Sequence, residues 1–267
     1  MTYQVAETSR RRPWIIGAGR VLVFVALIGI WEAVCAAGLL NAAYLPPPAQ
    51  VAGHLGALLG EAATWGALGE TVKAWLIGLG IALGVGIAAG VPLGASRALY
   101  RSARLVIDFC RAVPSIALLP LALLMFGSTI RMEVFLIAFA AVWIVLLQTI
   151  YGVWDIDPSL KEVMRSYRLT RAQRLRRLVL PSISSYVATG LRLASVVAFF
   201  VGIGAELLGG SPGIGLQIQT AEVAGSVPNE YAYAVIAAAL ALVVNLLLVR
   251  LERRFIFWRA AERAEPA

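Results

Sequence analysis

Residues 154–181 read WDIDPSLKEVMRSYRLTRAQRLRRLVLP and interrupt a chain that is otherwise almost entirely apolar. Seven residues of this stretch are basic, and long apolar runs flank it on both sides. A basic segment between two membrane spans belongs on the cytoplasmic face. Because the stretch carries helix signals rather than the composition of a linker, we expect it to dock onto a partner on that face.

The same stretch predicts two short helices joined by a bend. Asp157 can cap a first helix that begins at Pro158 and runs to about Tyr167. Thr170, with a glutamine three residues later as in a capping box, can cap a second helix that should stop before Pro181. The residues alone leave one alternative open, which is a pair of interfacial helices whose arginines lie near lipid phosphates.

The composition around this stretch is that of a membrane protein. Of 267 residues, 60% are hydrophobic and only 14% are charged, and the mean hydropathy is +0.81. A soluble protein would carry about 25% charged residues. We therefore expect an all-α, polytopic membrane protein with about six transmembrane helices. The expected spans are 21–40, 74–95, 113–126, 133–153, 186–208 and 231–251.

The basic residues are distributed unevenly among the connections between these spans. They gather before the first span, between the second and third, in 154–181 and in the C-terminal tail, whereas 41–70, 127–131 and 210–230 hold only Arg131. This alternation is the positive-inside pattern, and it predicts that both termini lie in the cytoplasm. It also accounts for the net charge of +8 without a nucleic acid as partner.

Two of the expected spans have unusual composition. The span 74–95 carries glycines at four-residue spacing, which allows close approach of another helix, and we favour packing within the subunit over a dimer face. These glycines are Gly80, Gly84, Gly86, Gly90 and Gly94. The segment 113–126 is short for a span and contains Pro114 and Pro120. Interrupted helices are tolerated where they line a cavity, so we expect this segment beside a translocation path.

Three charged residues, Glu32, Arg192 and Glu206, fall well within expected spans and should face protein or water rather than lipid. Arg192 and Glu206 are separated by about 21 Å along one helix, so they cannot pair with each other. One interpretation is that Arg192 helps a small anion to pass and Glu206 lines an outer gate. The interpretation that we favour is that both hold helices together.

The stretch from Glu162 to Pro181 resembles the EAA signature of permease subunits in bacterial ABC importers, with Glu162 as its glutamate and Leu180-Pro181 as its closing pair. It departs from that signature at Val163 and Met164, which replace two alanines, and at Arg168, which replaces a glycine. Further fragments resemble the nitrate/sulfonate/taurine branch of these permeases. They are LPPP (45–48), GVPLG (90–94), RAVPS (111–115), LPL (119–121), GLRL (190–193), AELL (205–208) and GIG (213–215).

The resemblance implies a type I ABC importer (MetI-like) transmembrane domain at 65–251, with 154–181 as its coupling loop. Residues 1–64 would hold a cytoplasmic tail, the first span and an outer segment, and 252–267 a second cytoplasmic tail. A separate cytoplasmic ABC ATPase would dock on the coupling loop. The docking residues would be Glu162, Arg165, Ser166, Arg168, Leu169 and Thr170. Arg192, Glu206, Pro114 and Ser115 would line the translocation path or support the structure around it.

The resemblance also implies an assembly in a bacterial inner membrane, surrounded by lipid. A second copy of the permease, as a homodimer, would complete the path. A periplasmic or lipid-anchored solute-binding protein would deliver the substrate, which would be a sulfonate, nitrate or a similar small anion.

The residues argue against catalysis by this chain. No phosphate-binding G-x-x-x-x-G-K occurs, so any ATPase must be a separate subunit. Asp155 and Asp157 form the only close acidic pair, and helix capping explains them better than the metal site of a lipid-modifying enzyme. We expect a non-catalytic subunit that binds no cofactor and no metal. A secondary transporter that needs no ATPase is the alternative.

Overall fold

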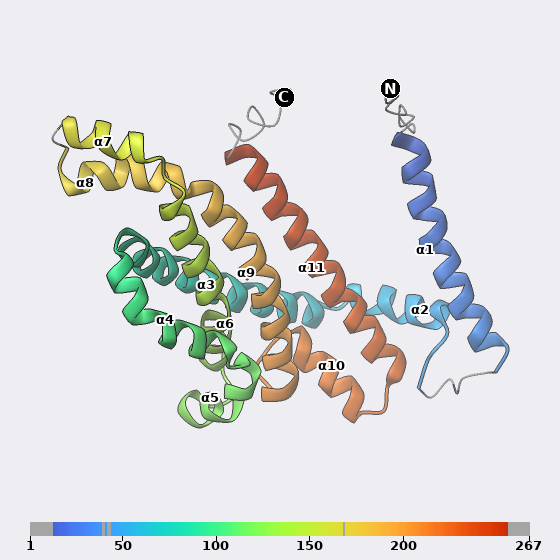
Figure 1. Cartoon of the computed structure of the whole chain (residues 1–267). Coiled ribbons are helices and arrows are strands. Elements are labelled where there is room, and N and C mark those ends of the chain that lie inside the picture. Colours follow the sequence, from blue (N-terminus) through green and yellow to red (C-terminus); the bar gives the residue numbers. More distant parts are fainter. Residues whose placement is uncertain (1–12, 39–40, 42–43, 168, 256–267) are drawn as a thin grey trace, which may run out of the picture.

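The structure is a computed structural model that describes residues 13–38, 41, 44–167 and 169–255. Within these residues every regular element is a helix (Figure 1). The elements are α1 (Pro13–Ala36), α2 (Pro48–Leu59), α3 (Ala62–Ala95), α4 (Arg97–Ala112), η1 (Ser115–Leu118), α5 (Leu119–Phe126), α6 (Ile130–Trp154), α7 (Pro158–Ser166), α8 (Arg171–Arg174), η2 (Leu175–Val179), α9 (Leu180–Gly209), α10 (Ile214–Val223) and α11 (Val227–Phe255).

The long apolar helices confirm a polytopic membrane protein. Among the described residues, α3, α6, α11 and the helical stretch Arg171–Val223 that contains α9 are long and apolar enough to cross a membrane. A fifth span results if α4 and the η1–α5 segment, which meet at 82°, are counted as one. In α1 the apolar segment Val25–Ala36 is shorter than a span. A span over 21–40, and with it the expected total of about six, stays a prediction.

The centre of the bundle is α6, against which α3 and α9 pack. Leu136, Ile137, Ala141 and Val145 of α6 are fully buried in the main core cluster. On α3, the glycines at 78, 86, 90 and 94 all face α6 closely. This confirms the expected packing within the subunit for three of the five predicted glycines. The prediction was wrong for Gly80 and Gly84, because a Cβ atom on either would meet nothing within 4 Å.

The helix α4 corrects the view of 97–111 as part of a basic connection. It packs along α6, where Tyr100 contacts Trp154 edge-on at 4.9 Å between ring centroids, and Ile107 is buried against Leu146. The helix ends at Ala112, because the next residue, Val113, precedes a proline and is extended (φ −71°, ψ 118°). The predicted segment 113–126 is therefore the second half, η1 and α5, of a broken helix.

The start of α9 differs from the prediction that a helix ends before Pro181. The chain stays helical from α8 through the π-helical turn η2 and into α9, with Pro181 in the first turn of α9. A π turn widens the helix by one residue, and here it lies directly ahead of the proline. The wider turn accommodates a ring that would otherwise clash with the preceding turn, so the helix is not interrupted.

Two helices, α2 and α10, lie at the end of the bundle opposite α7 and α8 (Figure 1). The α10 helix was not anticipated in the connection 210–230. Both helices pack on the beginning of α11, where Val51 of α2, Ile214 of α10 and Ile236 of α11 share a buried cluster. His54 adds a polar link, since its Nδ1 lies 2.7 Å from Asn229 Oδ1. The α1 helix contacts α2, and its Trp31 lies 6.2 Å between ring centroids from Tyr231 of α11. The rest of α1 stands apart from the bundle in Figure 1.

Candidate functional site

The predicted docking loop is an ordered pair of helices at one end of the molecule. Asp157 Oδ1 accepts a hydrogen bond from Ser159 N at 2.8 Å, which caps α7 as expected. Thr170 forms the expected capping box, because its Oγ1 accepts from Gln173 N at 3.3 Å and Gln173 Oε1 accepts from Thr170 N at 2.9 Å. Figure 1 shows α7 and α8 standing out to the side of the bundle at its upper left, where a partner can reach both.

The docking residues named from the sequence are spread over α7 and the bend that follows it. Glu162 and Ser166 are exposed on α7, and Ser166 Oγ donates to the Glu162 carbonyl at 3.2 Å. Leu169 is half-buried at the bend, where its carbonyl accepts from Arg174 Nε at 3.1 Å. Arg165 lies within α7. Arg168 lies outside the described residues.

Arg192 lies in the half of α9 nearer the docking loop, as expected. Its Nη1 is 3.6 Å from Glu252 Oε2 of α11, and the two side chains are 42% and 21% exposed. Both residues line a largely apolar cavity of about 400 Å³ between α3, α9 and α11. The ion pair links α9 to α11, which is the kind of contact that the structural role we favoured requires.

Glu206 is fully buried near the opposite end of α9. Its Oε2 accepts from Gly215 N at 2.7 Å, and Thr71 Oγ1 of α3 accepts from Ile214 N at 3.0 Å. These two side chains cap the first turn of α10, whose own N-cap residue, Gly213, has no side chain to do so. A Cβ atom on Gly213 would overlap the Glu206 carboxyl group, so the glycine is needed for this contact.

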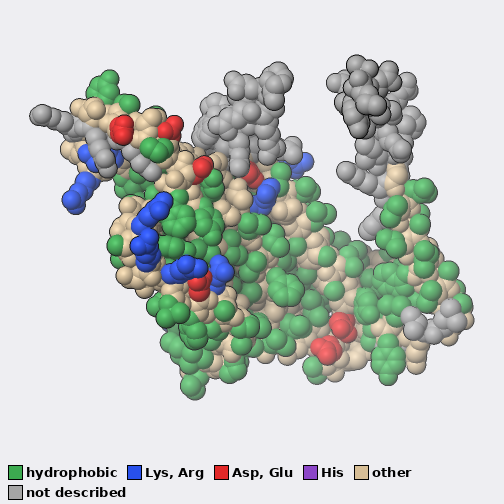
Figure 2. Space-filling view, in the orientation of Figure 1, with side chains coloured by type: hydrophobic (Ala, Val, Ile, Leu, Met, Phe, Trp, Pro, Cys, Tyr) green, Lys and Arg blue, Asp and Glu red, His purple; other side chains and the backbone are tan. Residues whose placement is uncertain are grey.

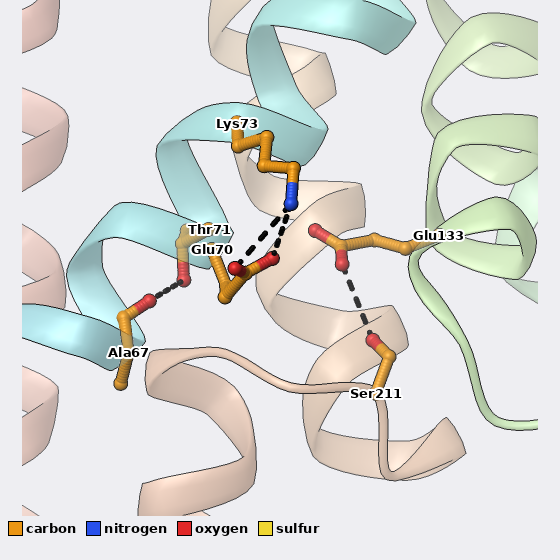
Figure 3. A network of polar contacts seen from close by, with 6 residues as sticks. All are labelled: Ala67, Glu70, Thr71, Lys73, Glu133 and Ser211. Atoms are coloured by element: carbon orange, nitrogen blue, oxygen red, sulfur yellow. Dashed lines mark hydrogen bonds and ion pairs between the residues drawn. The ribbon is translucent and has the colours of Figure 1, made fainter. Parts of the chain in front are cut away.

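A further buried carboxylate, Glu133, was missed from the sequence because it begins an expected span. It is fully buried in the first turn of α6, and its Oε2 accepts from Ser211 Oγ at 3.2 Å (Figure 3). Figure 3 also shows the nearby ion pair of Glu70 and Lys73 on α3, at 3.2 Å. The sequence signal for Glu133 is its position directly ahead of a long apolar run, where a charged residue is costly.

Pro114 and Ser115 lie at the break between α4 and η1, where they line a groove of about 400 Å³. Phe139 and Trp143 of α6 line another side of this groove. Arg111, in the last turn of α4, lines it as well. Arg111 was interpreted only as a topology signal. The structure thus places the candidate residues at four separate places rather than in one cluster, namely the docking loop, the Arg192–Glu252 ion pair, this groove and the Glu206 cap.

We expect loss of the Glu206 carboxylate to loosen α10. In Glu206→Ala the buried Gly215 N–H loses its acceptor, which costs about 1–3 kcal/mol. Thermal stability in detergent should therefore fall, and protease cleavage within 210–230 should accelerate. Glu206→Gln keeps an acceptor oxygen and should retain most of the stability. Glu222→Ala, at an exposed position on α10, is the control. Equal stability of Glu206→Ala and Glu222→Ala would contradict the capping role.

Comparison with known proteins identifies the family to which this helical bundle belongs. A family model described as the inner membrane component of binding-protein-dependent transport systems matches residues 80–257, which is more than half of the chain. The chain belongs to this family. It is therefore a multi-pass inner-membrane permease component that is not itself catalytic and that works with a separate ATPase and a binding protein.

Several relatives resemble this permease over most of their length. An aliphatic sulfonates transport permease of Bacillus subtilis (strain 168) is 26% identical over 95% of this chain and 93% of its own. A taurine transport permease of Escherichia coli (strain K12) is 27% identical over 87% and 86%. A nitrate import permease of Leptolyngbya laminosa is 27% identical over 85% and 82%.

Solved structures share the fold of this permease. A chain of the MetNI methionine ABC transporter in an inward-facing conformation superposes with a TM-score of 0.62 at 17% identity, and the match covers 69% of this permease and 92% of that chain. An amino acid ABC transporter gives a TM-score of 0.56 at 21% identity, covering 72% and 92%. This confirms the expected MetI-like transmembrane domain.

Proposed function

We propose that this permease imports a small organic or inorganic anion, with sulfonates as the preferred class. The observation that carries this proposal is the near full-length likeness to permeases named for aliphatic sulfonates, taurine and nitrate. Charge supports it, because Figure 2 shows Lys and Arg side chains gathered over α4 and beside α7 and α8 on a face that is otherwise mostly hydrophobic. A basic surface raises the local concentration of an anion.

The assembly that we propose is a homodimer with both termini in the cytoplasm. The projecting α7 and α8 helices, with their satisfied caps, suit a rigid contact that passes force from an ATPase to α6 and α9. The end that holds α2 and α10 would then face outward and receive the binding protein over 41–70 and 210–230. The division into 1–64, 65–251 and 252–267, with 154–181 as coupling loop, is part of this proposal.

Isolation of the tagged protein from its native membrane in mild detergent, with mass spectrometry of what accompanies it, tests the assembly. We expect a co-purifying ATPase with a phosphate-binding loop, and a homodimer by mass. The complete transporter in proteoliposomes, with its binding protein, should take up radiolabelled sulfonate only when ATP is supplied. Uptake by the permease alone, driven by an ion gradient, would instead establish a secondary transporter.

A further inference from the structure

The groove at the α4–η1 break lies at the middle of the membrane-spanning bundle. Phe139 and Trp143 lie about 14 and 20 Å along α6 from Ile130, in a helix about 36 Å long. Val197, which lines the same groove, is likewise near the middle of α9. Arg111 is therefore held at the depth of the membrane centre, far from the surface at which a positive-inside residue would lie.

The groove combines hydrogen-bond donors with an aromatic wall. Arg111, whose side chain is 50% exposed, has five N–H donors and no acceptor. Ser115 contributes a hydroxyl group, and the indole Nε1 of Trp143 is buried without an acceptor among the described residues. Trp143 also contacts Phe139 edge-on at 6.0 Å between ring centroids. None of the described residues that line the groove is acidic, so its chemistry favours an anion.

Among the residues that the structure describes, the only acidic partner of Arg111 is Asp108, on its own helix at 3.5 Å. Both side chains are about half exposed, and such pairs contribute little. Asp108 is moreover shared with Arg104, which also lies 3.5 Å from it. The guanidinium group of Arg111 is therefore available to a ligand.

The face of α4 next to the groove cannot be covered by lipid. Its charged residues recur at spacings of four and three, which places them on one side of the helix. They are Arg97, Arg101, Arg104, Asp108 and Arg111, and all five are exposed. A row of charges that extends to the membrane centre must face water or another protein chain. The groove therefore opens toward an aqueous or subunit-enclosed space, from which a solute can enter.

We propose that this groove is a substrate subsite of the permease, in which Arg111 and Ser115 bind the anionic head and Phe139 and Trp143 contact the apolar part of an organic sulfonate. This inference rests on the proposed function. A guanidinium group matches the oxygens of a sulfonate by paired hydrogen bonds. The volume of about 400 Å³ is within the range of small-molecule sites. The permease thereby contributes to selectivity in addition to its binding protein.

The test compares uptake of methanesulfonate and hexanesulfonate by the complete transporter in proteoliposomes. Arg111→Gln should lower uptake of both by about tenfold or more, because a charge-assisted contact is lost. Binding-protein-stimulated ATP hydrolysis should persist, which shows that the assembly is intact. Phe139→Ala should lower uptake of hexanesulfonate more than that of methanesulfonate. Arg111→Lys keeps the charge and should retain more uptake than Arg111→Gln at equal protein level.

Arg104→Gln is the matched control, because it removes an arginine from the same helix face and from the same Asp108 without altering the groove. Its uptake should stay within about twofold of the unaltered transporter. If Arg111→Gln and Arg104→Gln transport equally well, the subsite is wrong while the sulfonate assignment stands. If the unaltered transporter takes up neither sulfonate, both the substrate class and the subsite are wrong.

Discussion

Replacing Gly86 with leucine should destabilise this permease severely, whereas the same change at Gly84 should not. A Cβ atom on Gly86 would lie 2.8 Å from Val145 Cβ and 3.1 Å from the backbone nitrogen of Leu146. Because backbone atoms cannot rotate away, α3 and α6 would have to separate along their shared seam. Association of membrane helices depends on close van der Waals packing, so the expected cost is about 3 kcal/mol or more.

Thermal stability in detergent, measured as the fraction that stays monodisperse after heating, tests this prediction. Alanine substitutions make the comparison sharper, because Gly86→Ala should still destabilise. Gly84→Ala should stabilise by about 0.5–1 kcal/mol, since it removes a flexible residue from a helix at a position with open space. Equal or higher stability of Gly86→Ala relative to Gly84→Ala would show that the glycine seam does not hold α3 against α6.

Replacing Arg174 with proline should uncouple the permease from its ATPase. Arg174 N donates to the Thr170 carbonyl at 2.9 Å, and its Nε donates to the Leu169 carbonyl. Proline removes both bonds, and its ring clashes with the preceding turn at a cost of about 3 kcal/mol or more. Because α8 projects from the bundle, the spans should still fold. We expect normal yield but loss of substrate-stimulated ATP hydrolysis and of ATPase co-purification.

Arg171→Pro is the matched control, since it also exchanges an arginine for proline in α8. Arg171 is the first residue of this helix, where proline is favoured, and the preceding Thr170 is already extended (ψ 161°), as a residue before proline prefers. This variant should keep most of its coupling. Full coupling in Arg174→Pro would mean that the ATPase does not depend on an intact α8.

The local structure of the docking loop could be predicted because it depends on neighbouring residues. Asp157 and Thr170 cap the helices that their spacing predicted, since capping bonds join residues only two or three positions apart. The long apolar runs likewise predicted α3, α6, α9 and α11, because a membrane requires about 20 apolar residues per span.

The sequence reading was incomplete where the outcome depends on how one helix continues into another or packs against it. Pro181 was expected to end a helix, but a π turn directly ahead of it accommodates the ring within a continuous helix. Arg111 was interpreted only as a topology signal, and packing of α4 along α6 places it in a groove with Phe139 and Trp143. Neither result follows from local propensity, because each depends on how one helix continues into or lies against another.

The sequence alone therefore determined the class of protein, four long apolar helices, the capped helices of the predicted docking loop and the family, since these depend on composition and short spacings. Only the tertiary structure decided which glycines contact α6, which glutamate caps α10 and which arginine reaches the groove. Those features join residues far apart in the chain, such as Glu206 with Thr71 around the start of α10. Their pairing is set by the angle and register at which helices pack, and these follow from side-chain packing across the whole bundle.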